Sequence, residues 1–173
     1  TLQEANAIGV IDIESATVET ILPAHIADHS QVPLDSSNKD DTAELRTIPA
    51  KGLSMPDSIG AFTAGGQTYF ATANEGDARE WGIKEKDGGS GVYAEEAELK
   101  DLIEEGKVCE GALGAVNLDE LADKKQAGNL KLSTASGWNE EKGCFDELYS
   151  FGSRSFSIYD ANGTVVYDSG SDF

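Results

Sequence analysis

The sequence predicts a mainly β fold built from antiparallel hairpins. Two observations carry this prediction: apolar and polar side chains alternate along three pairs of short segments, and a short turn joins the members of each pair. The three predicted hairpins are residues 7–13 with 17–22, residues 58–63 with 67–74, and residues 155–160 with 164–169. A chain of 173 residues can bury one core, so we expect a single domain over residues 1–173.

The turns of the three hairpins differ in their chemistry. The first closes through residues 14–16 and the second through residues 64–66. The third contains Asn162-Gly163, a pair typical of a two-residue type I′ turn, in which both central residues take positive φ. If the hairpins belong to consecutive antiparallel meanders, these turns share one end of the sheets. The long connections, residues 23–57 and 75–154, then emerge at the other end, where loops commonly hold binding residues.

Residues 84–145 do not alternate, and we expect a small, partly helical insertion there. Residues 94–105 carry apolar side chains at helical spacing and precede Gly106, a favourable residue just beyond a helix end. Asn117, with Glu120 three positions later, resembles a capping box and predicts a second short helix.

The remainder of the insertion offers little for a core. Its glycine-rich residues 84–91 predict a flexible loop. Two short helices and such a loop bury little apolar surface, so we expect the insertion to have little core of its own. Cys109 and Cys144 both lie inside it, and they are either a disulfide pair or two reduced, buried thiols, depending on the redox compartment.

The charge balance is strongly acidic. The chain has 13 basic and 32 acidic residues, for a formal net charge of -19 at pH 7. This charge repels nucleic acid and anionic membranes, and it attracts divalent cations or basic partners. Simple solubility is the alternative explanation. No apolar run approaches the roughly 20 residues that span a bilayer, so we expect no membrane span. The chain starts within one strand pattern and ends just after another, so we expect a fragment of a larger protein.

The familiar signatures of catalysis are absent from the sequence. It contains no G-x-S-x-G nucleophile motif, no P-loop and no dinucleotide-binding fingerprint. The only histidines are His25 and His29, too few for a histidine-rich zinc site within the chain. The catalytic residues, if the protein has any, are therefore unknown.

One group of polar residues follows the second hairpin. Asn74, Glu75 and Asp77 surround a glycine, and Arg79 comes two positions later. The first interpretation is a salt-bridge network between Arg79 and a carboxylate. The second is a Ca²⁺ site at Glu75 and Asp77, because Ca²⁺ prefers oxygen ligands. A catalytic role is the third. Arg154 precedes the third hairpin, so we expect it to return to the same polar cluster and to pair with Glu75 or Asp77.

Three stretches of the sequence resemble those of a known family. They are MPDSI at residues 55–59, TANEGDARE at 72–80 and DELYSFGSRSFSI at 146–158. These are similar to signature stretches of the choice-of-anchor I family, which includes the mesenchyme-specific cell surface glycoproteins. The similarity runs in order through nearly the whole chain and is interrupted by the helical insertion. Asp146 and Glu147 lie in a matching stretch and join the candidate polar cluster, as ligands or as side chains that hold loop backbone N–H groups. Lys142 nearby weakens the transfer of a metal site to this stretch.

The resemblance implies a secreted or cell-surface β-propeller. The first hairpin would be the outer half of one blade, and the second and third hairpins would be the two halves of the next. The chain would then hold about one and a half blades, and the remaining blades would cover its open edges. A surface location is oxidising, so we predict that Cys109 and Cys144 are bonded. We expect a non-enzymatic surface module that binds Ca²⁺ or a surface or matrix partner; the alternative is a metal-dependent, phosphoesterase-like hydrolase.

Overall fold

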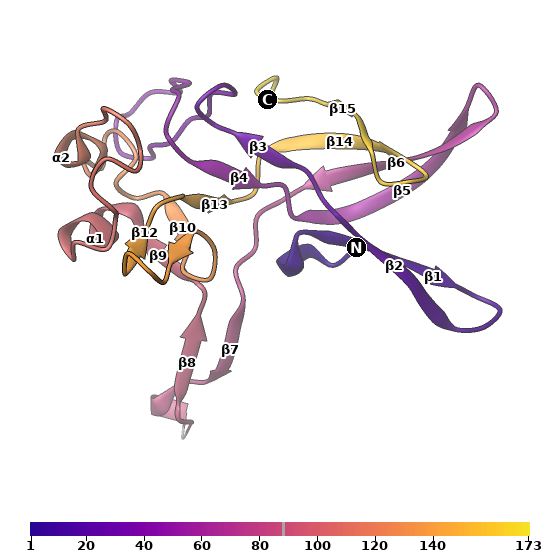
Figure 1. The fold of residues 1–173 in the computed structure, drawn as a ribbon, viewed down its shortest axis with the longest axis horizontal. Coiled ribbons are helices and arrows are strands. Elements are labelled where there is room, and N and C mark those ends of the chain that lie inside the picture. The colour runs from indigo at the N-terminus through magenta and orange to yellow at the C-terminus, as the bar shows by residue number, and fades with distance from the viewer. Residues whose placement is uncertain (88) are drawn as a thin grey trace. The chain divides into compact units, whose positions relative to one another are not determined.

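The structure is a computed structural model that describes residues 1–87 and 89–173. The fold is mainly β, with antiparallel sheets and two short α-helices (Figure 1). The strands are β1 (Ala7–Asp12), β2 (Thr17–Pro23), β3 (Ile26–Asp28), β4 (Lys51–Leu53), β5 (Pro56–Ala64), β6 (Gln67–Asn74), β7 (Glu80–Ile83), β8 (Gly91–Ala94), β9 (Glu96–Glu98), β10 (Lys131–Ser133), β11 (Trp138–Asn139), β12 (Cys144–Phe145), β13 (Tyr149–Phe151), β14 (Ser155–Asp160) and β15 (Val165–Asp168). The helices are α1 (Leu99–Glu104) and α2 (Leu118–Leu121), with short 3-10 turns at Gln3–Ala5 and Glu85–Asp87.

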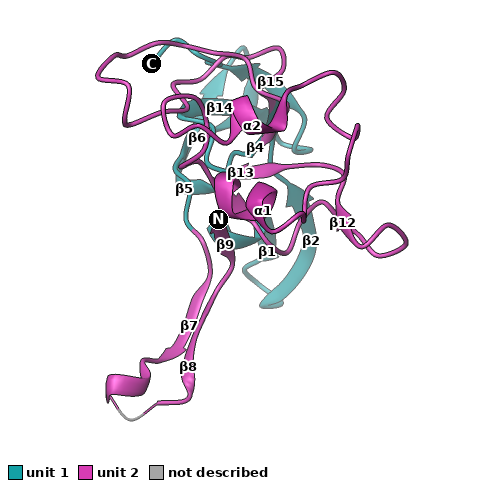
Figure 2. Cartoon of the chain, turned by 90° about the vertical axis from the view of Figure 1, so that its left-hand side faces the viewer, with its two compact units in different colours: residues 1–27, 52–77, 151–173 teal, residues 28–51, 78–150 magenta. Residues whose placement is uncertain are grey.

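The chain folds into two compact units. Unit 1 contains Thr1–Ala27, Gly52–Asp77 and Phe151–Phe173, and unit 2 contains Asp28–Lys51 and Ala78–Ser150 (Figure 2). Each unit is therefore assembled from segments that lie far apart in the sequence.

Unit 1 contains all three predicted hairpins. β1 pairs with β2 in a two-stranded sheet, and the other two hairpins join into one antiparallel sheet of order β15–β14–β6–β5. The join is the pairing of β6 with β14, from Asn74 opposite Ser155 to Tyr69 opposite Asp160. This register places the β5–β6 and β14–β15 turns at the same end of the sheet. The second and third hairpins therefore form one four-stranded sheet.

The type I′ turn occurs in a different hairpin from the one predicted. Gly65 and Gly66, between β5 and β6, both have positive φ (59° and 80°), as a type I′ turn requires. Asn162 is not among the residues with positive φ, so the prediction for the third hairpin is wrong. There the Asp160 carboxylate accepts the N–H groups of Asn162 and Thr164, each at 2.9 Å. These bonds favour a three-residue loop in which only Gly163, with φ 81°, is left-handed.

The predicted helices of unit 2 form but are shorter than expected. α1 starts at Leu99 rather than Ala94, because the preceding residues of β9 pair with β10. Its C-terminal end is followed by Gly106 with φ 66°, as predicted. α2 is capped by Asn117, whose side chain accepts the N–H groups of Asp119 and Glu120.

The insertion also contains strands that the sequence did not reveal. β7 and β8 pair as a hairpin, which Figure 1 shows as an extended arm, and residues 84–87 and 89–90 of the predicted loop lie at its tip. Residue 88 of that loop lies outside the described residues. β9 pairs with β10, and β10 pairs with β13 within a sheet of order β3–β4–β13–β10–β9. Short strands therefore lie on both sides of the two helices.

The expectation that the insertion has little core is wrong. Unit 2 has a hydrophobic cluster of buried residues: Ile48, Ala50, Leu99, Leu102, Val108, Leu121, Ala127, Leu132, Phe145 and Leu148. Two of these, Ile48 and Ala50, come from residues 23–57, the connection between the first two hairpins. Because residues 28–51 and 78–150 pack together, their combined apolar side chains are enough for a core.

Candidate functional site

The structure distributes the predicted polar residues between the two units. Asn74, Glu75, Asp77 and Arg154 belong to unit 1, and Arg79 belongs to unit 2 together with the Asp146-Glu147 pair. The gathering of all these residues into one cluster stays a prediction.

Asn74 is buried at the end of β6, where it organises a network of hydroxyl groups. Its Nδ2 donates to the Oγ atoms of Ser155 (2.9 Å) and Ser157 (2.7 Å), and its Oδ1 accepts from Thr72 (2.9 Å). The Asp168 carboxylate accepts from the same two serines. Alternation along paired strands places these side chains on one face. Both polar atoms of the Asn74 amide are therefore bonded to neighbouring side chains.

Glu75 and Asp77 lie on the surface around Gly76. In the part of the chain that the structure describes, no ion pair joins either carboxylate to Arg154. Gly76 is needed for a close approach of two backbones, because a Cβ built on it would lie 2.3 Å from the carbonyl carbon of Phe151. The backbone around the predicted cluster is therefore tightly packed, while its two carboxylates face solvent.

Arg79 forms a carboxylate network with a residue that the sequence analysis missed. Its Nη1 lies 2.8 Å from Oε2 of Glu95, and Oε1 of Glu95 accepts from Ser133 at 2.9 Å. Glu95 is 4% exposed, so this carboxylate needs its partners. It directly follows β8, whose register with β7 places it near Arg79. Recognition of that hairpin in the sequence would have suggested the pair.

Asp146 and Glu147 are each held by a different lysine. Asp146 Oδ2 accepts from Lys142 Nζ (2.9 Å) and Asn139 Nδ2 (2.6 Å), and these bonds, that of Lys142 first, lower the pKa of Asp146. The Glu147 carboxylate bonds to Lys51 Nζ (2.5 Å) and Tyr149 Oη (2.6 Å), and these bonds, that of Lys51 first, lower its pKa. Both carboxylates are therefore committed to partners inside the protein.

These two pairs predict separate pKa responses. We expect Lys142→Met to raise the pKa of Asp146 towards its ordinary value of 3.8, and Lys51→Met to raise that of Glu147 towards 4.5. Both pKa values are lowered in the folded state, so the stabilisation is present above the ordinary values and is lost as pH falls through the folded ones. Carboxyl ¹³C titration by NMR measures this, and each variant is the control for the other. Equal responses of both carboxyls to either substitution would contradict the assignment.

The predicted disulfide is confirmed. Cys109 and Cys144 are bonded, with their Cα atoms 5.2 Å apart. The N–H of Cys109 donates to the carbonyl of Phe145 at 2.9 Å. The crosslink therefore joins two segments of unit 2 that also meet through the backbone.

Metal-ligating side chains are not clustered in the described part of the chain. Among residues 1–87 and 89–173, no group of three or more histidine, cysteine, aspartate and glutamate side chains is arranged to hold a metal ion. In the same residues, no helix is both long and apolar enough to span a membrane.

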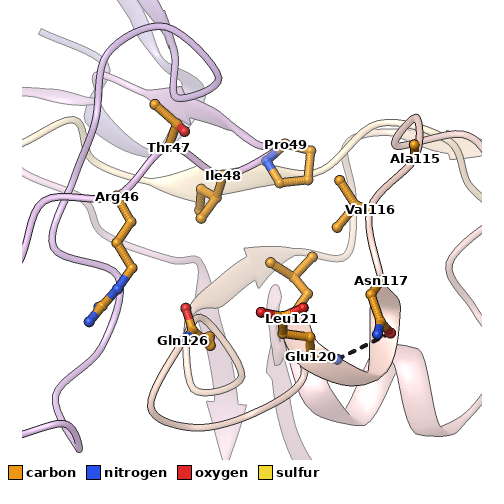
Figure 3. A pocket seen from close by; sticks show the side chains of 10 residues that line it. All are labelled: Arg46, Thr47, Ile48, Pro49, Ala115, Val116, Asn117, Glu120, Leu121 and Gln126. Carbon is orange, nitrogen blue, oxygen red and sulfur yellow. Dashed lines mark hydrogen bonds between the residues drawn. The ribbon is translucent and has the colours of Figure 1, made fainter.

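Unit 2 contains a pocket of about 320 Å³ that the sequence analysis did not single out. Its lining comes from two stretches of the chain: Arg46, Thr47, Ile48 and Pro49 in one, and Ala115, Val116, Asn117, Glu120, Leu121 and Gln126 in the other (Figure 3). Ile48 and Leu121 are buried in the core of the unit, so the core supports the pocket. Val116 and Glu120 lie at the surface, and the Glu120 carboxylate is in no ion pair among the residues described. The pocket thus combines an apolar wall with a free carboxylate.

Comparison with known proteins identifies one family. The family profile described as "Choice-of-anchor I domain" matches residues 1–173, the full length of the chain. No curated protein and no solved structure matches the chain significantly. The family match agrees with the sequence resemblance. The chain therefore belongs to the choice-of-anchor I domain family.

Proposed function

We propose that this chain is a non-enzymatic module of a secreted or cell-surface protein, and that its acidic surface binds a positively charged partner. Membership of the choice-of-anchor I family indicates the surface association. The observation that carries the binding role is the excess of carboxylates. Of 32 acidic residues, most are in no ion pair of the described residues. Such a surface attracts cations and basic proteins over several ångströms and accelerates their association.

The bonding of the candidate carboxylates supports binding over catalysis. A metal-dependent hydrolase needs clustered carboxylates with an open metal position. Glu95, Asp146 and Glu147 are instead bonded to arginine, lysine, asparagine, serine or tyrosine side chains. These bonds support a structural role for the three carboxylates.

Glu75 and Asp77 are the candidate Ca²⁺ ligands of this proposal. Both are exposed and in no ion pair of the described chain, so a cation could reach them without breaking an existing bond. Carboxylate oxygens are the ligands that Ca²⁺ prefers.

The antiparallel sheet supports a propeller architecture for the intact protein. A propeller blade is a four-stranded antiparallel sheet, and β15–β14–β6–β5 has this form. The two-stranded β1–β2 sheet would be half of a second blade. Its Ile11, Val18 and Ile21 side chains are each more than half exposed, and further blades of the parent protein would cover them.

A binding assay with model polymers tests the proposed function. We expect the chain to bind poly-L-lysine and not poly-L-glutamate, with affinity falling as NaCl rises from about 50 to 200 mM because salt screens the attraction. The control is an unrelated protein of the same size and net charge, which should bind poly-L-lysine more weakly. Equal binding by this control would show that net charge alone accounts for the affinity, and it would contradict the proposal of a specific binding surface. A Ca²⁺-dependent phosphatase activity that survives purification would favour the hydrolase alternative.

A further inference from the structure

We propose that the pocket lined by residues 46–49, 115–117, 120, 121 and 126 receives a lysine or arginine side chain of the partner protein. This inference rests on the proposed function and names the part of the surface where the positively charged partner binds. The pocket lies wholly within unit 2.

The lining of the pocket matches the two parts of such a side chain. Lysine and arginine have an apolar stem and a charged head, and they bury the stem along apolar surface while the head meets polar groups. Ile48, Pro49, Val116 and Leu121 supply an apolar wall for the stem. Glu120 supplies a carboxylate for the head, since no cationic side chain of the described residues is paired with it.

The position of Glu120 is set by the local backbone. Asn117 caps α2 by accepting the N–H groups of Asp119 and Glu120, which fixes the turn that carries the carboxylate. The next residue, Leu121, is 8% exposed and packs in the core. One end of this turn is therefore held by hydrogen bonds and the other by burial. Binding would need little rearrangement, which lowers its entropic cost.

Arg46 also lines the pocket, but its charge is already matched. Its Nη2 lies 2.5 Å from Asp40 and 2.8 Å from Glu44. The bond to Asp40 is the main cause that raises the pKa of Arg46, so the guanidinium stays charged and paired. Its Nη1 is buried and has no hydrogen-bond partner among the described residues. An anionic ligand would have to compete with two carboxylates beside Arg46 and would meet a third at Glu120. The surroundings therefore favour a cation.

NMR titration of the whole chain with single amino-acid probes tests the assignment. The probe is Nα-acetyl-lysine amide; Nα-acetyl-norleucine amide has a similar stem without the charge, and Nα-acetyl-glutamate amide carries the opposite charge. We expect the lysine probe to shift the methyl signals of Ile48, Val116 and Leu121, with weaker shifts from the norleucine probe and none from the glutamate probe. Stronger binding of the glutamate probe would overturn the proposal in favour of an anion site.

Two charge-neutralising variants separate the pocket from the general acidic surface. Glu120→Gln is expected to weaken binding of the lysine probe about fivefold, as loss of one partly screened ion pair predicts. Asp119→Asn removes the same charge from the same turn but does not line the pocket, so we expect less than a twofold change. Val116→Ser should weaken binding of the lysine probe and of the norleucine probe to the same extent, because it changes the apolar wall that both stems would contact. Backbone amide spectra confirm that each variant is folded.

The outcomes distinguish this inference from the proposed function. If poly-L-lysine binds this chain more tightly than it binds the matched control protein, the proposed function stands. If, at the same time, Glu120→Gln and Asp119→Asn weaken binding of the lysine probe equally, the pocket assignment fails. If the lysine probe binds in a Glu120-dependent way while poly-L-lysine shows no preference over the control, the proposed function fails and the pocket is a site for a small cation.

Discussion

Replacing Cys109 and Cys144 together with serine is expected to lower the free energy of unfolding by about 3 to 4 kcal/mol. The bond closes a loop between residues 35 positions apart, and the chain-entropy model gives roughly this value for such a loop. Urea denaturation of the double variant and the wild type measures the difference.

The matched control for this prediction is the wild type treated with a reductant. It should lose the same stability as the double variant, because both lack the crosslink and keep the surrounding packing. Val108 and Phe145, which flank the two cysteines, stay buried in the core in either case. A loss below about 1 kcal/mol would mean that this core alone constrains the two segments.

Gly76→Ala is expected to lower the free energy of unfolding by about 2 to 3 kcal/mol. A Cβ at this position would lie 2.3 Å from the carbonyl carbon of Phe151 and 2.5 Å from the nitrogen of Gly152. Both are backbone atoms, so relief requires a shift of the chain rather than a rotation of a side chain. Chemical or thermal denaturation measures the loss.

Gly60→Ala is the control for Gly76→Ala. Neither glycine has positive φ, and a Cβ on Gly60 would meet no atom within 4 Å. Gly60 lies within β5. Alanine there lowers the conformational entropy of the unfolded chain and causes no strain in the folded one, so we expect unchanged or slightly higher stability. If both variants lost equal stability, the close approach at Gly76 would not be the cause.

The predicted hairpins and helix ends agree with the structure because short-range interactions specify them. Alternating side chains along β1, β6 and β14 define strands through their neighbours in the sequence. The Asn117 cap and the positive φ of Gly106 depend on the backbone within one helical turn.

The turn at Asn162 shows the limit of short motifs. The Asn-Gly pair permits a type I′ turn but does not require it, because the Asp160 carboxylate nearby stabilises a longer loop. The two glycines at residues 65 and 66, which have no side chain to favour another geometry, form the type I′ turn instead.

The partners of the candidate site residues depended on distant contacts. Arg79 and its partner Glu95 are joined by the β7–β8 hairpin, whose strands alternate too weakly to be recognised in the sequence. Glu147 pairs with Lys51, which lies 96 positions away, and no local pattern connects them. The sequence therefore indicated which polar residues lie near one another along the chain, but it did not indicate which side chains they bond to in the fold.

The sequence alone determined the β class, the hairpins, the acidic charge and the family resemblance, which rest on composition, on spacing within about ten residues, or on motifs read directly from the chain. The disulfide was predicted only through the surface location that the resemblance implies. Only the tertiary structure revealed the core of unit 2, the buried network around Asn74 and the pocket beside Glu120. These features form when segments far apart in the sequence pack together, since burial makes their apolar contacts favourable and obliges their polar groups to find partners.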